Sequence, residues 1–234
     1  MKRLISLLVA LSLLLSSAFV WSDPAHAAST KTLKATVKVG ALKKVSLKKY
    51  GIKSSDTYIG YAFDGDSMDN VGNCNINCVN NKLYLQGTAS GELSYLLEFE
   101  SGKKIKLRGK VTGKPSKHKN YNGIYANIKS FKGKKYSYTD IHLTPDYDAR
   151  GNINELTVEI GKISNISKKS VKTDIKIAFY DKNKKKIETV QAGKQMENPQ
   201  SDIEPGNEEY IYSGKLNLSV NQCKKVKYWR IIKM

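Results

Sequence analysis

The chain has 234 residues and carries 40 Lys and Arg against 21 Asp and Glu, which gives a formal net charge of +19 at pH 7. A surplus of this size attracts polyanions through long-range electrostatics and counterion release. Almost all of the cations are lysines, which suit a diffuse positive field better than bidentate recognition of phosphates or bases. The composition therefore argues against a sequence-specific nucleic-acid-binding protein.

The first 27 residues have the organisation of a signal peptide. A basic start at Lys2 and Arg3 precedes an apolar run over residues 4–21, and Ala25-His26-Ala27 has the small residues that signal peptidase requires. An uncleaved membrane anchor is the competing interpretation, because the run approaches the roughly 20 residues that span a bilayer. Serines dilute the run, however, and Pro24 follows it. We expect cleavage after residue 27 and a secreted, extracellular protein, associated with the cell wall and in contact with the membrane only during export.

Alternating patterns dominate the rest of the chain. Polar and apolar residues alternate over residues 33–39, 105–111, 174–180 and 215–220, which predicts half-buried strands. Turn-forming pairs such as Asn80-Asn81 separate these runs. Residues 42–52 are the best candidate for a short helix, and no segment has three turns of amphipathic helix. Regularly spaced strands without intervening helices predict an all-β protein built of antiparallel sandwiches.

Turn formers over residues 145–152 indicate a domain boundary. On this basis we expect a basic β-rich domain at 28–150 and an immunoglobulin-like antiparallel β-sandwich at 151–234. The second region resembles the FxLYD family and similar immunoglobulin-like modules of bacterial exported proteins. The resemblance rests on Phe179-Tyr180-Asp181 and on the corner Glu204-Pro205-Gly206, with Ile177 and Phe179 where the family motif has Phe and Leu. The resemblance covers residues 153–234 and concerns how the strands pack. It does not imply any catalytic residues.

Three cysteines follow the predicted cleavage site, namely Cys74, Cys78 and Cys223. An exported protein favours disulfides, but an odd count leaves one thiol over, and the pairing stays open. No second cysteine pair or nearby histidine completes a zinc site. The acidic clusters at 64–70 and 146–151 depart from a calcium loop at Met68 and Arg150. We expect no metal and no cofactor.

The strongest functional signal is residues 103–135, which contain 12 Lys or Arg and no Asp or Glu. Four of these cations alternate along one predicted strand and therefore project from one face, with tyrosines interleaved further along the segment. A solvated face that keeps a β protein soluble is the simpler explanation. The candidate polyanion-binding residues are Lys104, Lys106, Arg108, Lys110, Lys117, Lys119, Lys132, Lys134, Lys135, Tyr121 and Tyr125.

Only two histidines follow the predicted signal peptide, His118 and His142. Together with a lysine they could carry acid–base cleavage of a phosphodiester. Our first hypothesis is an exported, non-enzymatic β protein that binds an anionic cell-envelope polymer or a partner protein. The alternative is a secreted, nuclease-like hydrolase that uses the two histidines.

Overall fold

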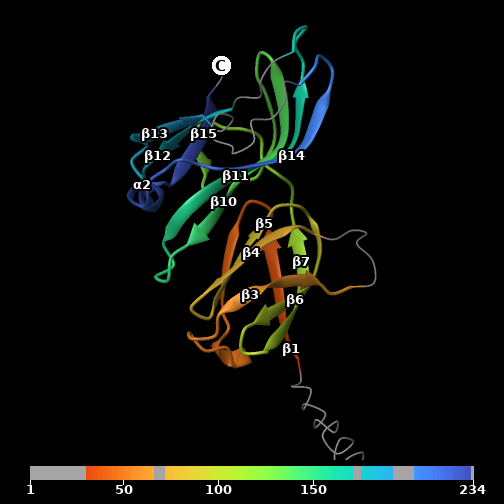
Figure 1. Ribbon diagram of the computed structural model, residues 1–234, viewed down its shortest axis with the longest axis vertical. Coiled ribbons are helices and arrows are strands. Elements are labelled where there is room, and N and C mark those ends of the chain that lie inside the picture. Colours follow the sequence, from red (N-terminus) through yellow and green to blue (C-terminus); the bar gives the residue numbers. More distant parts are fainter. Residues whose placement is uncertain (1–29, 66–71, 171–174, 192–202, 233–234) are drawn as a thin grey trace, which may run out of the picture. The chain divides into compact units, whose positions relative to one another are not determined.

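A computed structural model describes residues 30–65, 72–170, 175–191 and 203–232. The predicted signal peptide and most of the acidic cluster at 64–70 lie outside these ranges. Within them the protein is nearly all β, with several sheets of mainly antiparallel strands, which confirms the predicted fold class (Figure 1). The immunoglobulin-like arrangement of the C-terminal region stays a prediction.

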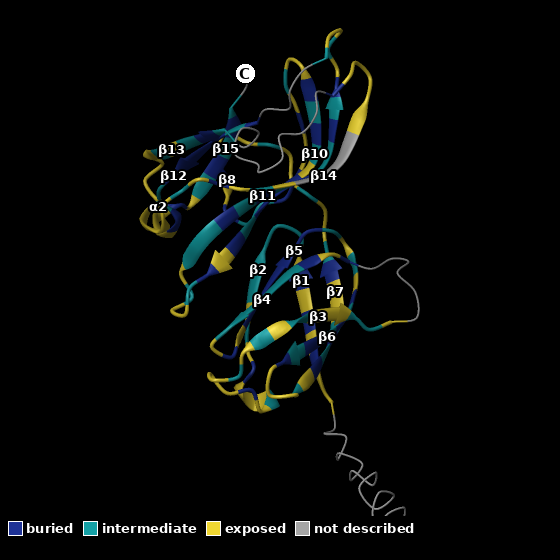
Figure 2. Ribbon diagram, viewed as in Figure 1, coloured by how far each residue is buried: buried dark blue, intermediate teal, exposed yellow. Residues whose placement is uncertain are grey.

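Two sheets enclose the first hydrophobic core. In sheet order, the first consists of β1 (Lys31–Lys38), β7 (Lys104–Thr112), β6 (Gly91–Phe99) and β3 (Tyr58–Phe63), and the second of β2 (Leu42–Ser46), β5 (Lys82–Gly87) and β4 (Cys74–Val79). The predicted alternation along β1 and β7 is confirmed, because apolar residues such as Leu33 and Ile105 are buried while their neighbours face outward (Figure 2).

Gly109 explains how β7 lies so close to β1. It adopts a φ of +150°, and a Cβ atom at this position would lie 1.7 Å from the carbonyl oxygen of Ala35. No L side chain fits against the neighbouring backbone at that distance, so glycine is required here.

Two further sheets enclose the second core. In sheet order, one consists of β14 (Glu208–Lys215), β11 (Ile153–Asn165), β10 (Tyr136–Tyr147) and β9 (Ile128–Lys132), and the other of β13 (Lys186–Gln191), β12 (Lys176–Tyr180), β15 (Tyr228–Ile232) and β8 (Asn122–Gly123). Phe179 and Trp229 are cross-strand neighbours, and both side chains are fully buried in this core.

The turn at residues 148–152, where the sequence indicated a domain boundary, connects β10 and β11 of one sheet. Its geometry depends on the Asp148 carboxylate, which accepts hydrogen bonds of 2.9 Å from the backbone N–H groups of Arg150 and Asn152. The acidic cluster at 146–151 therefore builds a turn. In the described chain, the passage from the first core to the second lies between Val111 and Ile124.

Two local predictions are corrected. The predicted strand over 215–220 is wrong, because β14 ends at Lys215 and α2 (Val220–Lys225) begins after Ser219. The Ser219 side chain accepts from the Gln222 backbone N–H while the Gln222 side chain accepts from the Ser219 N–H, a capping box that starts the helix. In the range 42–52, β2 is followed only by a three-residue 3-10 helix, η1 (Lys48–Tyr50).

Polar side chains connect the elements of the two cores. The amide of Gln86 donates to the Leu143 carbonyl at 2.9 Å, and that of Asn127 donates to the Thr88 carbonyl at 2.7 Å. The described residues include no helix with the length and apolar character needed to cross a bilayer.

Candidate anion-binding surface

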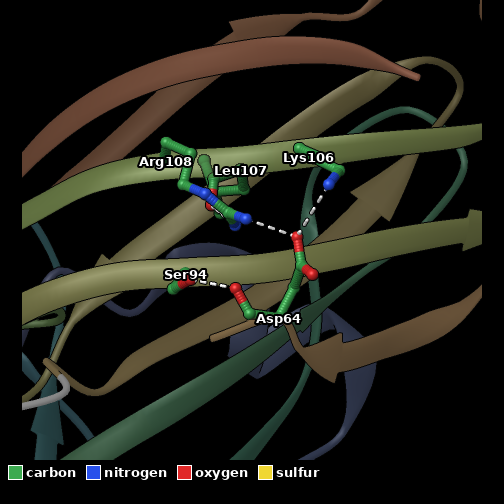
Figure 3. Close-up of polar contacts among 5 residues, drawn as sticks. All are labelled: Asp64, Ser94, Lys106, Leu107 and Arg108. Carbon is green, nitrogen blue, oxygen red and sulfur yellow. Dashed lines mark hydrogen bonds and ion pairs between the residues drawn. The ribbon is translucent and has the colours of Figure 1, made fainter. Parts of the chain in front are cut away.

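The outward cations of β7 are held by carboxylates. Lys104 forms an ion pair of 2.6 Å with Glu98 on β6. Asp64, which directly follows β3, contacts the guanidinium of Arg108 and lies 3.7 Å from Nζ of Lys106 (Figure 3). The predicted face is therefore formed, but three of its four cations already have acidic partners.

The Asp64 carboxylate is kept ionised by this arrangement. The hydrogen bond from Arg108 is the main reason that the pKa of Asp64 lies below its ordinary value, and the charge of Lys106 adds to it. The Ser94 hydroxyl donates to the Asp64 carbonyl oxygen and ties the backbone to β6 (Figure 3). Of the four β7 cations, only Lys110 has no ion pair within the described chain. An anionic ligand at this face would compete with carboxylates already in place.

The other predicted cations are distributed over separate elements. Lys132 ends β9, and Lys134 and Lys135 form the β9–β10 turn, where the Lys135 carbonyl accepts a 2.8 Å hydrogen bond from Ile166 N–H. Tyr125 is not with these lysines, because its hydroxyl accepts a 3.4 Å hydrogen bond from that of Tyr147. The structure therefore does not assemble the predicted residues into one surface.

A group that does assemble surrounds Tyr121. Its ring meets that of Tyr180 edge-on at 4.9 Å between centroids and that of Tyr228 at 6.2 Å. The ammonium of Lys184 lies over the Tyr121 ring, 5.1 Å from its centroid, within the range of a cation–π interaction.

The pairing of four strands brings this group together. Lys186, Tyr180, Tyr228 and Gly123 are successive cross-strand neighbours through β13, β12, β15 and β8. Tyr121 directly precedes β8, so it reaches the two tyrosines of the same row. The Lys227 backbone N–H donates to the Tyr180 carbonyl at 2.9 Å, which places a further lysine beside them.

Side-chain hydrogen bonds hold the two loops of this group. In the β12–β13 turn, the Asp181 carboxylate accepts from the N–H groups of Asn183 at 2.8 Å and Lys185 at 2.9 Å. In the loop before β8, the Asn122 side chain accepts from Lys119 N–H at 3.2 Å and donates to the Lys119 carbonyl at 3.1 Å. These hydrogen bonds fix the backbone of both loops, and the exposed lysines of the group extend from that backbone.

We call this surface the aromatic–lysine patch. It consists of Lys119, Tyr121, Tyr180, Lys182, Lys184, Lys185, Lys186, Lys227 and Tyr228. All six lysines are exposed, and none of them has an ion pair with an acidic residue in the ranges that the structure describes. Sequence reasoning identified only Lys119 and Tyr121. The sequence feature that could have pointed to the remaining residues is the lysine-rich stretch at 182–186, which overlaps the turn-forming residues Asp181-Lys182-Asn183.

The two histidines lie in different places. His118 packs against Phe131 with 5.1 Å between ring centroids, and its Nε2 accepts a 3.3 Å hydrogen bond from the Ile231 N–H. His142 lies on β10, with its Nε2 3.3 Å from the Glu159 carboxylate. They line separate cavities, so the structure does not bring them into one acid–base pair.

The three cysteines all lie in the described chain and are free thiols, so none of the disulfides that the sequence left open is formed. Cys74 and Cys78 lie four residues apart on β4. At about 3.3 Å per residue their Cα atoms are about 13 Å apart, whereas a disulfide needs less than about 7 Å. Cys223 is buried in the other core. No group of three or more metal-ligating side chains occurs among the described residues.

No known protein-family model matches the chain, and no curated protein matches it either. The resemblance of the C-terminal region to FxLYD modules therefore stays a prediction, and the proposals below rest on the chain's own residues.

Proposed function

We propose that this is an exported, non-enzymatic protein that binds an anionic phosphodiester polymer of the cell envelope through the aromatic–lysine patch. The observation that carries the proposal is the set of six exposed lysines without acidic partners around Tyr121, which itself contacts Lys184. Asp181 is the one acidic residue within their turn, and its carboxylate binds backbone N–H groups.

The chemistry of the patch suits a polymer better than a single small anion. Lysine ammonium groups are strongly hydrated point charges that attract successive phosphates without fixing one geometry. Release of counterions from the polymer adds a favourable, salt-sensitive contribution. The ring of Tyr121 offers an apolar surface for the carbon skeleton between phosphates, and its face also attracts cations.

The β7 face provides a matched comparison, because there Glu98 and Asp64 already form ion pairs with three of the four cations. A variant that removes three charges from the patch is Lys182→Gln, Lys184→Gln and Lys186→Gln. A control that removes the same number from β7 is Lys104→Gln, Lys106→Gln and Arg108→Gln. The two variants have equal net charge, so a difference between them reports location and not overall charge.

The test is binding of purified poly(glycerol phosphate) teichoic acid, measured by calorimetry over a series of salt concentrations. For the patch variant we expect affinity to fall at least about tenfold at low salt and the slope of log K against log salt to become shallower by about 2. For the β7 control we expect a much smaller change.

Equal losses in the two variants would show that only net charge matters and would refute the assignment to the patch. No binding by the parent protein at low salt would refute the function itself. Duplex DNA of matched charge is a comparator, and for DNA we expect no dependence on base sequence.

A further inference from the structure

A second site lies away from the patch, in a cavity of about 580 Å³ that shares no residue with it. The cavity is lined from both cores. Its polar and aromatic residues include Tyr61, Asn75, Asn127, Asp140, His142 and Glu159. Its volume falls in the range of small-molecule sites and far exceeds the share of a single water.

Two buried side chains that line the cavity have polar atoms without hydrogen-bond partners in the described chain. His142 is 8% exposed and has no partner for Nδ1, and Asn127 is 2% exposed and has none for Oδ1. The Asn127 amide nitrogen, by contrast, is already bound to the Thr88 carbonyl. A buried polar atom without a partner is unfavourable, so a ligand hydroxyl that reaches either atom would gain affinity.

The backbone is irregular where it borders the cavity. Asp140 has a φ of +53°, and strand pairing passes from Thr139–Lys162 to Ile141–Ile160 without including it. Gly161, which lies opposite Asp140, is skipped as well, and the register is the same on both sides, so Asp140 is a left-handed residue within an otherwise regular pairing. Aspartate adopts this conformation more readily than most residues, and such backbone outliers are common beside functional sites. Gly161 accommodates it, because a Cβ there would lie only 3.0 Å from Cβ of Asp140.

The Glu159 carboxylate is held in place by a chain of hydrogen bonds. Asn75 donates to the Thr144 hydroxyl at 2.8 Å, and that hydroxyl donates to Glu159 at 2.6 Å. Contact with His142 is the main reason that the pKa of Glu159 lies below its ordinary value. Glu159 therefore stays an ionised, oriented acceptor.

Charge narrows the class of ligand. The lining holds two carboxylates, Asp140 and Glu159, and no lysine or arginine, which disfavours an anion. The net charge of +19 disfavours a cation. An uncharged ligand rich in hydroxyl groups can donate hydrogen bonds to the carboxylates and to the Asn127 oxygen. It is repelled neither by the two carboxylates nor by the positive charge of the protein.

An aromatic platform completes the site. Tyr61 is 48% exposed, and its ring packs edge-to-face against Tyr95 with 5.3 Å between centroids. A supported, partly exposed ring of this kind suits the C–H face of a sugar. We infer that the cavity binds an uncharged saccharide, with Tyr61 against the sugar ring and with Asp140, Glu159 and Asn127 accepting from its hydroxyls.

The experiment uses calorimetry on the full chain with cellotetraose, maltotetraose and the tetramer of N-acetylglucosamine. We expect at least one of them to bind. Tyr61→Ala and Asp140→Asn should each weaken that binding at least about tenfold, since each removes a direct contact. Asparagine tolerates the left-handed conformation, so Asp140→Asn tests the charge and not the backbone geometry. Ile59→Ala is the matched control, because Ile59 is exposed on the same strand and does not line the cavity.

The outcomes separate this proposal from the previous one. The triple lysine variant of the patch should bind the saccharide as the parent does. Absence of binding of all three saccharides at millimolar concentration would overturn the inference. So would a preference for tetragalacturonate or for a diamine, or unchanged binding in both Tyr61→Ala and Asp140→Asn.

Discussion

At the scale of single residues, burial makes the three thiols unreactive. Burial raises the pKa of Cys74 to about 12 and that of Cys78 to about 11, and it also raises the pKa of Cys223. Because only the thiolate is nucleophilic, iodoacetamide at about pH 8 should leave the folded protein unlabelled. In urea without reductant all three thiols should be alkylated, as counted by mass spectrometry. A single alkylation there would reveal a disulfide and contradict the structure.

Residue-level patterns predict which way a side chain faces but not what lies opposite it. Alternation along 104–110 correctly placed Lys106 and Arg108 on the outer face. It could not indicate that Asp64, which lies 44 residues before Arg108, contacts both. The same limit applies to Lys184 and Tyr121, which are joined only through strand pairing.

At the scale of elements, α2 depends on its cap, because six residues make too short a helix to be stable by themselves. Ser219→Ala removes the acceptor for the Gln222 N–H and should lower the free energy of unfolding by about 1 kcal/mol. Urea denaturation measures the change. Asn221→Ala, at an exposed position in the same helix, should change it by less than about 0.5 kcal/mol. Equal effects would show that the cap contributes nothing.

Whether a strand or turn was predicted correctly depends on how much of its structure is determined by neighbouring residues in the sequence. Runs that alternate next to clear turns, such as β1 and β7, were predictable. Residues 215–220 also alternate, but the capping box formed by Ser219 and Gln222 overrides a pattern of only six residues. The turn formers at 145–152 signal a turn correctly. They do not reveal that β10 and β11 on either side are paired in one sheet.

At the scale of the whole molecule, strand order decides where the candidate sites are. The sheet order β13-β12-β15-β8 joins residues 121, 180, 184 and 228, which no window of sequence contains. The cavity likewise combines Tyr61 and Asn75 with Asp140 and Glu159. Composition indicated a charged surface and alternation correctly indicated a β fold, but only the pairing of distant strands determines where the candidate sites lie.

Acid should destabilise the folded protein through identifiable carboxylates. Asp56 has the clearest shift, because hydrogen bonds from the Lys103 ammonium and the Lys53 N–H lower its pKa from 3.8 to about 2. A carboxyl with a lowered folded-state pKa binds fewer protons folded than unfolded, so its stabilising contribution is present above about pH 4 and is lost as pH falls towards 2.

The variant that tests this is Asp56→Asn, measured by urea unfolding from about pH 6 to pH 2. It should be less stable than the parent at pH 6, and the difference should fall to a small fraction of that value near pH 2, where the parent carboxyl is about half protonated. Growing positive charge destabilises every variant in acid, so Glu100→Gln is the control, since Glu100 is exposed and forms no ion pair in the described chain. A constant difference between Asp56→Asn and the parent at all pH values would mean that Asp56 acts by packing, and the electrostatic account of Lys103 would then fail.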